Sequence, residues 1–269
     1  MFGLFPKKKI RVTLPDDTRV IAIGDIHGQL DRLTKVMELV DQYVEKNPIK
    51  NEHIVFLGDY TDRGPRSAEV VEYLANRQLA ALKTKRREIF IQGNHEDLVQ
   101  EALSDLGTRQ DLWWRNGGLS TVSSYLDFRN VQTSPDASNE ERLRLFRENY
   151  PEKHAAFMQT LKDYVQIGRL IFVHAGLRMD QNLIDQSTDD MHWIRDSFLH
   201  WSGEPKDYLI VHGHSITNKM KPEIFNHRVG IDTGSYKEKG RITAAIFEKN
   251  HVRFLSNGTR KGFVQTIFS

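Results

Sequence analysis

Five short apolar runs recur along the chain, and each ends in a turn that carries glycine, histidine or acidic residues. The runs are "RVIAIGDIHG" (19–28), "HIVFLGDYTDRG" (53–64), "EIFIQGNHE" (88–96), "RLIFVHAG" (169–176) and "YLIVHGHS" (208–215). Their apolar residues are consecutive rather than alternating, which predicts strands that are covered on both faces.

Helical patterns lie between the early runs. Residues 30–46 place apolar side chains at helical spacing, and residues 67–82 predict a second helix with Ser67 as its N-cap. Strand–helix–strand units of this length predict an α/β architecture with right-handed crossovers.

The middle of the chain has a different character. From about Ser104 to Ile167 it is polar and helical, with a loop-like "VQTSPDASNEE". We interpret residues 103–167 as a helical cap inserted into a single domain that spans residues 1–269. Four strand-like runs follow Ser215 and suggest a second sheet packed on the first, hence a β-sandwich with helices outside.

Composition narrows the functional classes. The 269 residues are 39% hydrophobic and 28% charged with a net charge of +2, which argues for neither a nucleic-acid nor a membrane partner. We interpret the basic run Lys7–Arg11 as a solvated arm. There is no cysteine, which excludes disulfides, thiolate nucleophiles and cysteine-based metal sites. We expect a cytoplasmic monomer.

Metal-binding side chains follow the ends of all five runs. They are Asp25 and His27, then Asp59, Asn94, His174 and His214. Ligands in α/β sheets gather at the carboxyl ends of strands, so these groups would converge. In an extended segment Asp25 and His27 would point to the same side, which permits chelation.

Each fragment alone also fits a structural role, but five such strand ends in one chain favour a metal site. Oxygen and nitrogen ligands without sulfur suit manganese, iron or zinc rather than calcium. Six side chains are too many for one catalytic ion with an open position and the right number for two ions that share a ligand. We therefore expect two divalent ions per chain, with manganese preferred.

The ordered motifs "GDIHG", "GDYTDRG", "GNHE", "HAG" and "GHS" resemble the signature of the phosphoprotein phosphatase family, within the calcineurin-like metallophosphoesterases. The resemblance runs from Gly24 to Ser215 and is to bacterial and phage serine/threonine protein phosphatases. It implies the calcineurin-like fold, a central β-sandwich of two mixed sheets flanked by helices. "VGIDTGS" resembles the strand that follows the last ligand in these proteins.

The resemblance also implies roles for individual residues. Asp25 and His27 would hold the first metal, Asp59 would bridge, and Asn94, His174 and His214 would hold the second. His95 would be the general acid, oriented by Asp62. Arg63 would grip the phosphoryl oxygens, and Arg195 in "HWIRDSF" would be the second arginine.

The chemistry is consistent without the family. Two cations that share a carboxylate make a hydroxide available near neutral pH, and it can attack phosphorus directly. Arginine forks stabilise the phosphoryl oxygens. A histidine can protonate the departing alkoxide, so no covalent intermediate is needed.

The remaining polar candidates are expected to be structural. Glu96 would begin a helix without a catalytic role, and Trp113 and Trp114 would pack in the cap. His212 could act behind the ligands or on substrate, and Asn116 could lie near the pocket.

Three functions stay open. The first is hydrolysis of phosphoserine or phosphothreonine in proteins. The second is symmetrical cleavage of a dinucleoside polyphosphate such as diadenosine tetraphosphate at the same site. Contacts in the cap would then decide between this substrate and a phosphoprotein. The third is a decayed phospho-ligand scaffold, against which the presence of every ligand, the acid and Arg63 argues.

Overall fold

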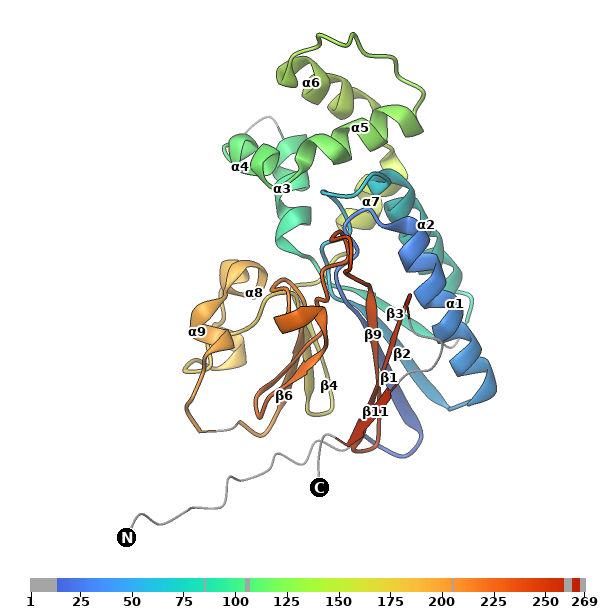
Figure 1. Ribbon diagram of the computed structural model, residues 1–269, viewed down its shortest axis with the longest axis vertical. Coiled ribbons are helices and arrows are strands. Elements are labelled where there is room, and N and C mark those ends of the chain that lie inside the picture. Colours follow the sequence, from blue (N-terminus) through green and yellow to red (C-terminus); the bar gives the residue numbers. More distant parts are fainter. Residues whose placement is uncertain (1–13, 85, 105–106, 205, 259–262, 267–269) are drawn as a thin grey trace.

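A computed structural model describes residues 14–258 and 263–266, apart from residues 85, 105, 106 and 205. The basic run Lys7–Arg11 lies outside the described residues. Two mixed sheets pack face to face (Figure 1), as the resemblance implied. The first has the order β11-β10-β9-β1-β2-β3, with β1 (Thr18–Ile23), β2 (Asn51–Phe56), β3 (Arg87–Phe90), β9 (Thr243–Glu248), β10 (His251–Ser256) and β11 (Phe263–Thr266).

The second sheet has the order β4-β5-β6-β8-β7. Its strands are β4 (Tyr164–Ile167), β5 (Leu170–Val173), β6 (Leu209–His212), β7 (Glu223–Ile224) and β8 (Arg228–Gly230). The prediction that the runs after Ser215 form the second sheet was wrong for three of four. β9, β10 and β11 continue the first sheet, because β9 pairs antiparallel with the free side of β1.

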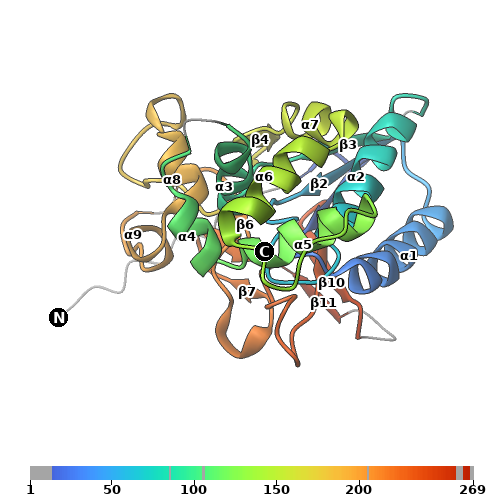
Figure 2. The ribbon, with the colours of Figure 1, turned by 90° about the horizontal axis from the view of Figure 1, so that it is seen from above.

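Burial on both faces explains the consecutive apolar runs. In β1, Ile21 and Ile23 face a core shared with helices, while Val20 and Ala22 face the core between the sheets. The helices of the first core are α1 (Leu30–Lys46), α2 (Ser67–Ala81) and α7 (Glu152–Met158); α8 (Thr188–Trp193) and α9 (Asp196–Leu199) lie beside the second sheet (Figure 2).

The cap helices form a layer above one end of the sheets (Figures 1 and 2). They are α3 (Asn94–Leu103), α4 (Gln110–Arg115), α5 (Gly118–Phe128) and α6 (Asn139–Asn149), with their own apolar core around Trp113 and Phe146. Two elements of the range 103–167 lie elsewhere. Phe157 of α7 packs in the main core, and β4 is the edge strand of the second sheet.

Ser67 is not the N-cap that the sequence suggested. It is the first residue of α2, fully buried, and its hydroxyl accepts the backbone N–H of Asp62 at 3.1 Å. The serine therefore fixes the turn after β2 rather than the end of the helix.

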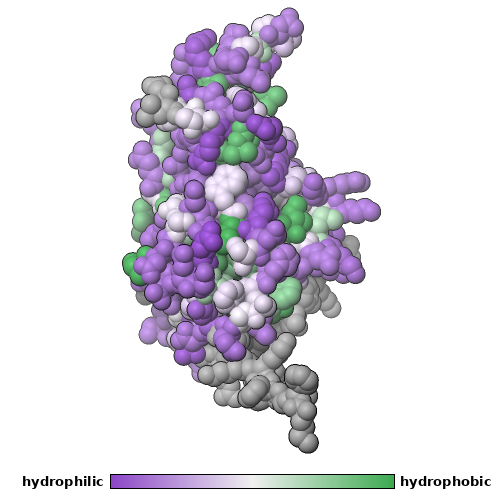
Figure 3. All heavy atoms as spheres, turned by 90° about the vertical axis from the view of Figure 1, so that its left-hand side faces the viewer, coloured by the Kyte–Doolittle hydropathy of each residue, from purple (hydrophilic) through white to green (hydrophobic). Residues whose placement is uncertain are grey.

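Within the described residues, no helix is long and apolar enough to cross a membrane. The face seen in Figure 3 is largely hydrophilic, with apolar side chains scattered singly or in small groups. Such scattered residues are normal for protein surfaces and do not by themselves mark an interface.

Glu72 links α2 to α7. Its carboxylate lies 2.6 Å from Nζ of Lys153 and 2.9 Å from Nε2 of the fully buried His154. Partial burial opposes ionisation, but the hydrogen bonds from Lys153 and His154 outweigh it and lower the pKa of Glu72 to about 2. Because that pKa is depressed from its ordinary value of 4.5, the contribution to stability is complete above pH 4.5 and is lost as the pH falls towards 2.

Replacing Glu72 by glutamine should therefore lower the free energy of unfolding at pH 6, and the deficit relative to wild type should shrink by pH 3. Urea unfolding at several pH values measures this. The matched control is Glu148→Gln, whose ion pair with Arg144 on α6 is exposed on both sides. A deficit that grows as the pH falls would contradict the assignment.

Candidate active site

Each predicted ligand follows the carboxyl end of a strand. Asp25 and His27 follow β1, Asp59 follows β2, Asn94 opens α3 after β3, and His174 and His214 follow β5 and β6. None is more than 6% exposed. The strands come from both sheets, so the site lies where the ends of the two sheets meet below the cap.

The turns that carry these residues are strained. Five of the nine non-glycine residues with positive φ in the described chain are His27, Asp59, Asp62, Arg63 and His214. Such backbone is costly and persists mostly where function requires it. His27 thus differs from the extended conformation that the sequence suggested, because its φ of 49° turns it toward Asp59.

Asp59 stands between two groups of imidazoles. Its Oδ2 lies 3.4 Å from Nε2 of His27 and 3.8 Å from Nε2 of His95, and its Oδ1 lies 3.2 Å from Nε2 of His174. Ligand atoms of Asp59, His174 and His214 all lie within 4.8 Å of one another. One carboxylate therefore presents an oxygen to each of two potential ion sites.

The donor atoms fit cations. The Nδ1 atoms of His27 and His174 lie 2.9 Å and 2.7 Å from backbone carbonyl oxygens, which can only accept, so both Nε2 atoms carry a lone pair. Around Nε2 of His174, Asn94 Oδ1 lies at 3.1 Å and His214 Nδ1 at 3.2 Å. An amide oxygen and two ring nitrogens that converge this closely form a nitrogen and oxygen donor set, so the residues present fit a pair of divalent ions.

Asp25 lies at the same end of the sheets. Its carboxylate accepts the backbone N–H of His214 at 3.0 Å, and burial, followed by the charges of Asp232 and Asp59, raises the pKa of Asp25. Asp232, from "VGIDTGS", is 3% exposed and burial raises its pKa to about 6. Sequence reasoning did not single out Asp232, although its place two residues after β8 repeats the pattern of a polar group beyond a strand end.

His95 and Asp62 form a buried pair. Nδ1 of His95 lies 2.6 Å from Oδ2 of Asp62, and neither side chain is more than 1% exposed. Burial opposes protonation of His95, but Asp59 and the hydrogen bond to Asp62 outweigh it and raise its pKa. The protonated imidazole can donate from Nε2 while Nδ1–H stays on Asp62.

The cap holds Asp62 in place. The indole N–H of Trp113 donates to both carboxylate oxygens of Asp62, at 3.1 and 3.0 Å, and the Thr121 hydroxyl donates at 2.6 Å. Trp113 packs in the cap as predicted, but its hydrogen bonds to Asp62 were missed. The cap is thus part of the support of the acid pair.

The two arginines lie at different sides of the ligands. The Arg63 guanidinium lies 4.5 Å over the ring of Tyr236, whose centroid is 5.1 Å from that of His27. Arg195 donates to the Ser215 hydroxyl at 3.1 Å, next to His214. Tyr236 is a further candidate contact for substrate that the sequence did not reveal, since nothing local distinguishes it from other loop tyrosines.

The structure explains why a polar acid, Glu96, closes the segment "GNHE" (93–96) that follows β3. Its carboxylate accepts the backbone N–H groups of Asp59 at 2.7 Å, Tyr60 at 2.8 Å and Gly93 at 3.1 Å, and burial raises its pKa to about 7. It lies in the first turn of α3, which Asn94 opens, and these backbone hydrogen bonds occupy its carboxylate. Its function is to tie the turn after β2 to the turn after β3.

Two weaker candidates use their side chains in local hydrogen bonds. His212 is fully buried; burial, followed by the charge of Arg228, lowers its pKa to about 3, and its Nδ1 lies 2.9 Å from the carbonyl oxygen of Gly213. It therefore supports the turn that presents His214. Asn116 uses its side-chain amide to donate to Leu112 within α4.

Two mixed sheets with acidic, amide and imidazole side chains at their strand ends define a metallophosphoesterase. Residues 18–258 match the calcineurin-like phosphoesterase family, and the chain belongs to it. It is accordingly a hydrolase of the metallophosphoesterase family.

The chain is 27% identical over 271 residues to an asymmetrical bis(5'-nucleosyl)-tetraphosphatase, PrpE, of Halalkalibacterium halodurans, covering 91% of this chain and 96% of that protein. It is 25% identical to the Shewanella-like protein phosphatase 1 of Plasmodium berghei over 60% of this chain and 40% of that one. A solved cold-active protein tyrosine phosphatase has the same fold, with a TM-score of 0.63 at 16% identity over 96% of this chain and 83% of that one.

Replacing Trp113 by phenylalanine removes one donor to Asp62 and keeps most of the packing. We expect stability to fall by about 1–3 kcal/mol, because a buried carboxylate loses a hydrogen bond. We also expect kcat on an alkyl phosphate to fall about tenfold, with KM little changed. Urea unfolding and steady-state kinetics measure the two effects. The matched control is Trp114→Phe, whose ring stacks on Trp113 at 5.0 Å; equal losses in both variants would reduce Trp113 to a packing residue.

Proposed function

We propose that the protein is a two-metal phosphomonoesterase that acts on phosphoserine or phosphothreonine in polypeptides. The observation that carries the proposal is the buried His95–Asp62 pair, at 2.6 Å, beside Asp59. An alkoxide is a poor leaving group that needs a proton, whereas a departing nucleotide phosphate is already a stable anion at neutral pH. A positioned general acid therefore favours an alkyl phosphate over a dinucleoside polyphosphate as the substrate.

The chain's own residues have distinct tasks in this reaction. Asp25 and His27 would hold one ion, Asp59 both, and Asn94, His174 and His214 the other. Two such ions supply water of lowered pKa and positive charge against the phosphoryl oxygens. Arg63 and Arg195 would bind the phosphoryl oxygens and orient the ester, and His95 would give its Nε2 proton to the leaving oxygen while Asp62 keeps the ring in place.

A dinucleoside polyphosphate is the second candidate substrate, and a specific observation favours it. The PrpE relative, which carries the name of an asymmetrical tetraphosphatase, matches nearly its whole length, cap included. The sequence suggested symmetrical cleavage; the relative's name favours the asymmetrical pattern, which would release a mononucleotide and a nucleoside triphosphate. The decayed scaffold has less support, because every predicted ligand, His95 and both arginines lie at the same end of the fold.

The deciding experiment compares a phosphothreonine peptide with diadenosine tetraphosphate, each with manganese and with a chelator control. Chelator-sensitive turnover of the peptide supports the proposal. A hundredfold preference for the dinucleotide, about 2.7 kcal/mol in transition-state terms, moves the function to nucleotide hydrolysis, and chromatography of the products then gives the cleavage pattern. Manganese as the bound metal, a monomeric state and a cytoplasmic location stay predictions.

A further inference from the structure

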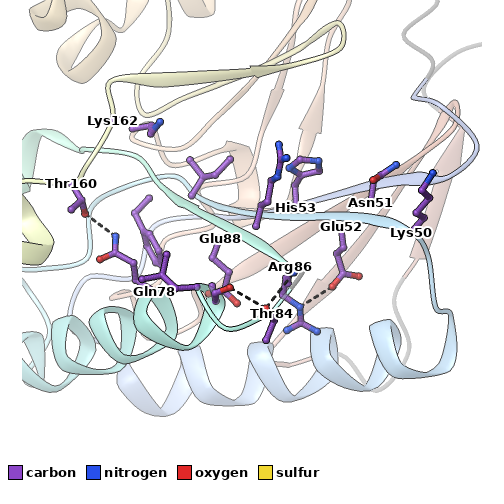
Figure 4. A pocket seen from close by; sticks show the side chains of 15 residues that line it. Lys50, Asn51, Glu52, His53, Gln78, Thr84, Arg86, Glu88, Thr160 and Lys162 are labelled. Atoms are coloured by element: carbon purple, nitrogen blue, oxygen red, sulfur yellow. Dashed lines mark hydrogen bonds and ion pairs between the residues drawn. The ribbon is translucent and has the colours of Figure 1, made fainter.

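A groove of about 1000 Å³ runs along the amino-terminal half of β2 and the whole of β3. Figure 4 shows its side chains in two rows: Lys162, His53 and Lys50 on one side, and Gln78, Thr84 and Arg86 beside α2 on the other. The active-site residues follow the carboxyl ends of the same strands and none of them lines the groove; along β3, the lining residue Phe90 precedes Asn94 by roughly 13 Å of extended chain. The groove is therefore a separate surface.

One wall of the groove is an open sheet edge. β3 is the last strand of its sheet. Only its end is covered on the outer side, where Lys162 N–H donates to the carbonyl of Phe90 at 2.9 Å and Gln92 N–H donates back at 2.9 Å. Strand alternation places the backbone groups of Glu88 on this same outer side, and no backbone partner for them occurs among the described residues.

The groove has an excess of positive charge. Both carboxylates that line it are already paired, Glu52 with Arg19 at 2.9 Å and Glu88 with Arg77 at 2.6 Å. Arg87 and Lys162 also line it, are exposed, and have no ion-pair partner within the described part of the chain. Their charge is available to a ligand.

The groove also has groups that a peptide could satisfy. Nδ1 of His53 is buried without a hydrogen-bond partner among the described residues. Leu82, which lines the groove at the end of α2, is 80% exposed. An extended chain with alternating acidic and apolar side chains would meet both the cations and this leucine.

We propose that the groove binds an extended acidic segment of a partner polypeptide, which adds as a strand to the free edge of β3. Strand addition uses the main chain for affinity and alternate side chains for specificity. A polypeptide fits better than a nucleic acid, because the free edge offers backbone N–H and C=O groups and the ring of Phe90 in the groove is only 3% exposed and cannot stack on bases. The surface does not depend on which phosphoester the active site cleaves.

The test is fluorescence anisotropy of the full chain with a labelled EVEVEVE peptide at low salt. We expect saturable binding that weakens with salt and falls at least tenfold in Arg87→Glu and in Lys162→Glu. The matched control is Lys221→Glu, an exposed lysine before β7 at the far edge of the second sheet. All three variants should keep their activity on 4-nitrophenyl phosphate within twofold, which shows that they are folded.

Strand addition has its own readouts. A peptide N-methylated at alternate residues should bind at least tenfold more weakly, and hydrogen exchange of segment 87–92 should slow when EVEVEVE is bound. The proposal is overturned if the N-methylated peptide binds as tightly as EVEVEVE. It is also overturned if a KVKVKVK peptide binds with the same affinity as EVEVEVE. Oligothymidylate that binds more tightly than EVEVEVE and is weakened by the same variants would assign the groove to nucleic acid instead.

Discussion

Replacement of His95 by asparagine is expected to lower kcat on a phosphothreonine peptide by about 10²- to 10⁴-fold, the range for loss of a general acid. Asp62 cannot replace the imidazole as proton donor, because it lies behind His95 and its carboxylate accepts hydrogen bonds from Trp113 and Thr121. With 4-nitrophenyl phosphate, whose leaving group is a stable anion, the loss should be less than tenfold.

The split between the two substrates is the informative quantity. A residue that only supported the fold would lower both rates together. The matched control is His200→Asn, a largely exposed histidine near Asp196 that should leave both rates unchanged. If His95→Asn reduces both substrates equally while metal content stays at the wild-type level, His95 does not deliver the proton.

The second large effect concerns Asp59. Asp59→Asn removes the carboxylate that faces both groups of imidazoles, at 3.4 Å from His27 and 3.2 Å from His174. We expect kcat/KM to fall by about 10³-fold or more, since several kcal/mol of transition-state stabilisation comes from bound ions. We also expect bound metal, measured by elemental analysis, to fall below two ions per chain.

Metal content separates the possible causes of that loss. The control Asp127→Asn changes an exposed carboxylate at the end of α5 and should keep both ions and full activity. An Asp59→Asn protein that retains two ions and loses activity would place Asp59 in another role. A wild-type protein that binds no manganese, zinc or iron would contradict the metal site itself.

The strand ends could be predicted from the sequence because two signals coincide there. A run that is buried on both faces must be apolar throughout, so polar groups at its end stand out, as at Asp59 and Asn94. The helix over residues 30–46 was predicted to the residue, since its apolar face has regular spacing. The sheet to which β9 belongs was not predicted, because the sequence does not show which side of β1 is left free for pairing.

The support of the acid pair could not be predicted in the same way. Trp113 and Thr121 are 51 and 59 positions away from Asp62, and they meet it only because α4 and α5 pack above the sheet ends. In sequence an indole in an apolar helix is indistinguishable from a packing residue. Tyr236 is similar, since its contact with Arg63 depends on the path of a loop.

The separation of the ligands along the chain has a consequence for biosynthesis. His214 N–H donates to Asp25, 189 positions earlier, and the second ion position needs His214 together with Asn94 and His174. A ribosome-bound chain that ends before β6 holds only part of the donor set. The full donor set therefore exists only after the chain has been synthesised through His214, beyond β6.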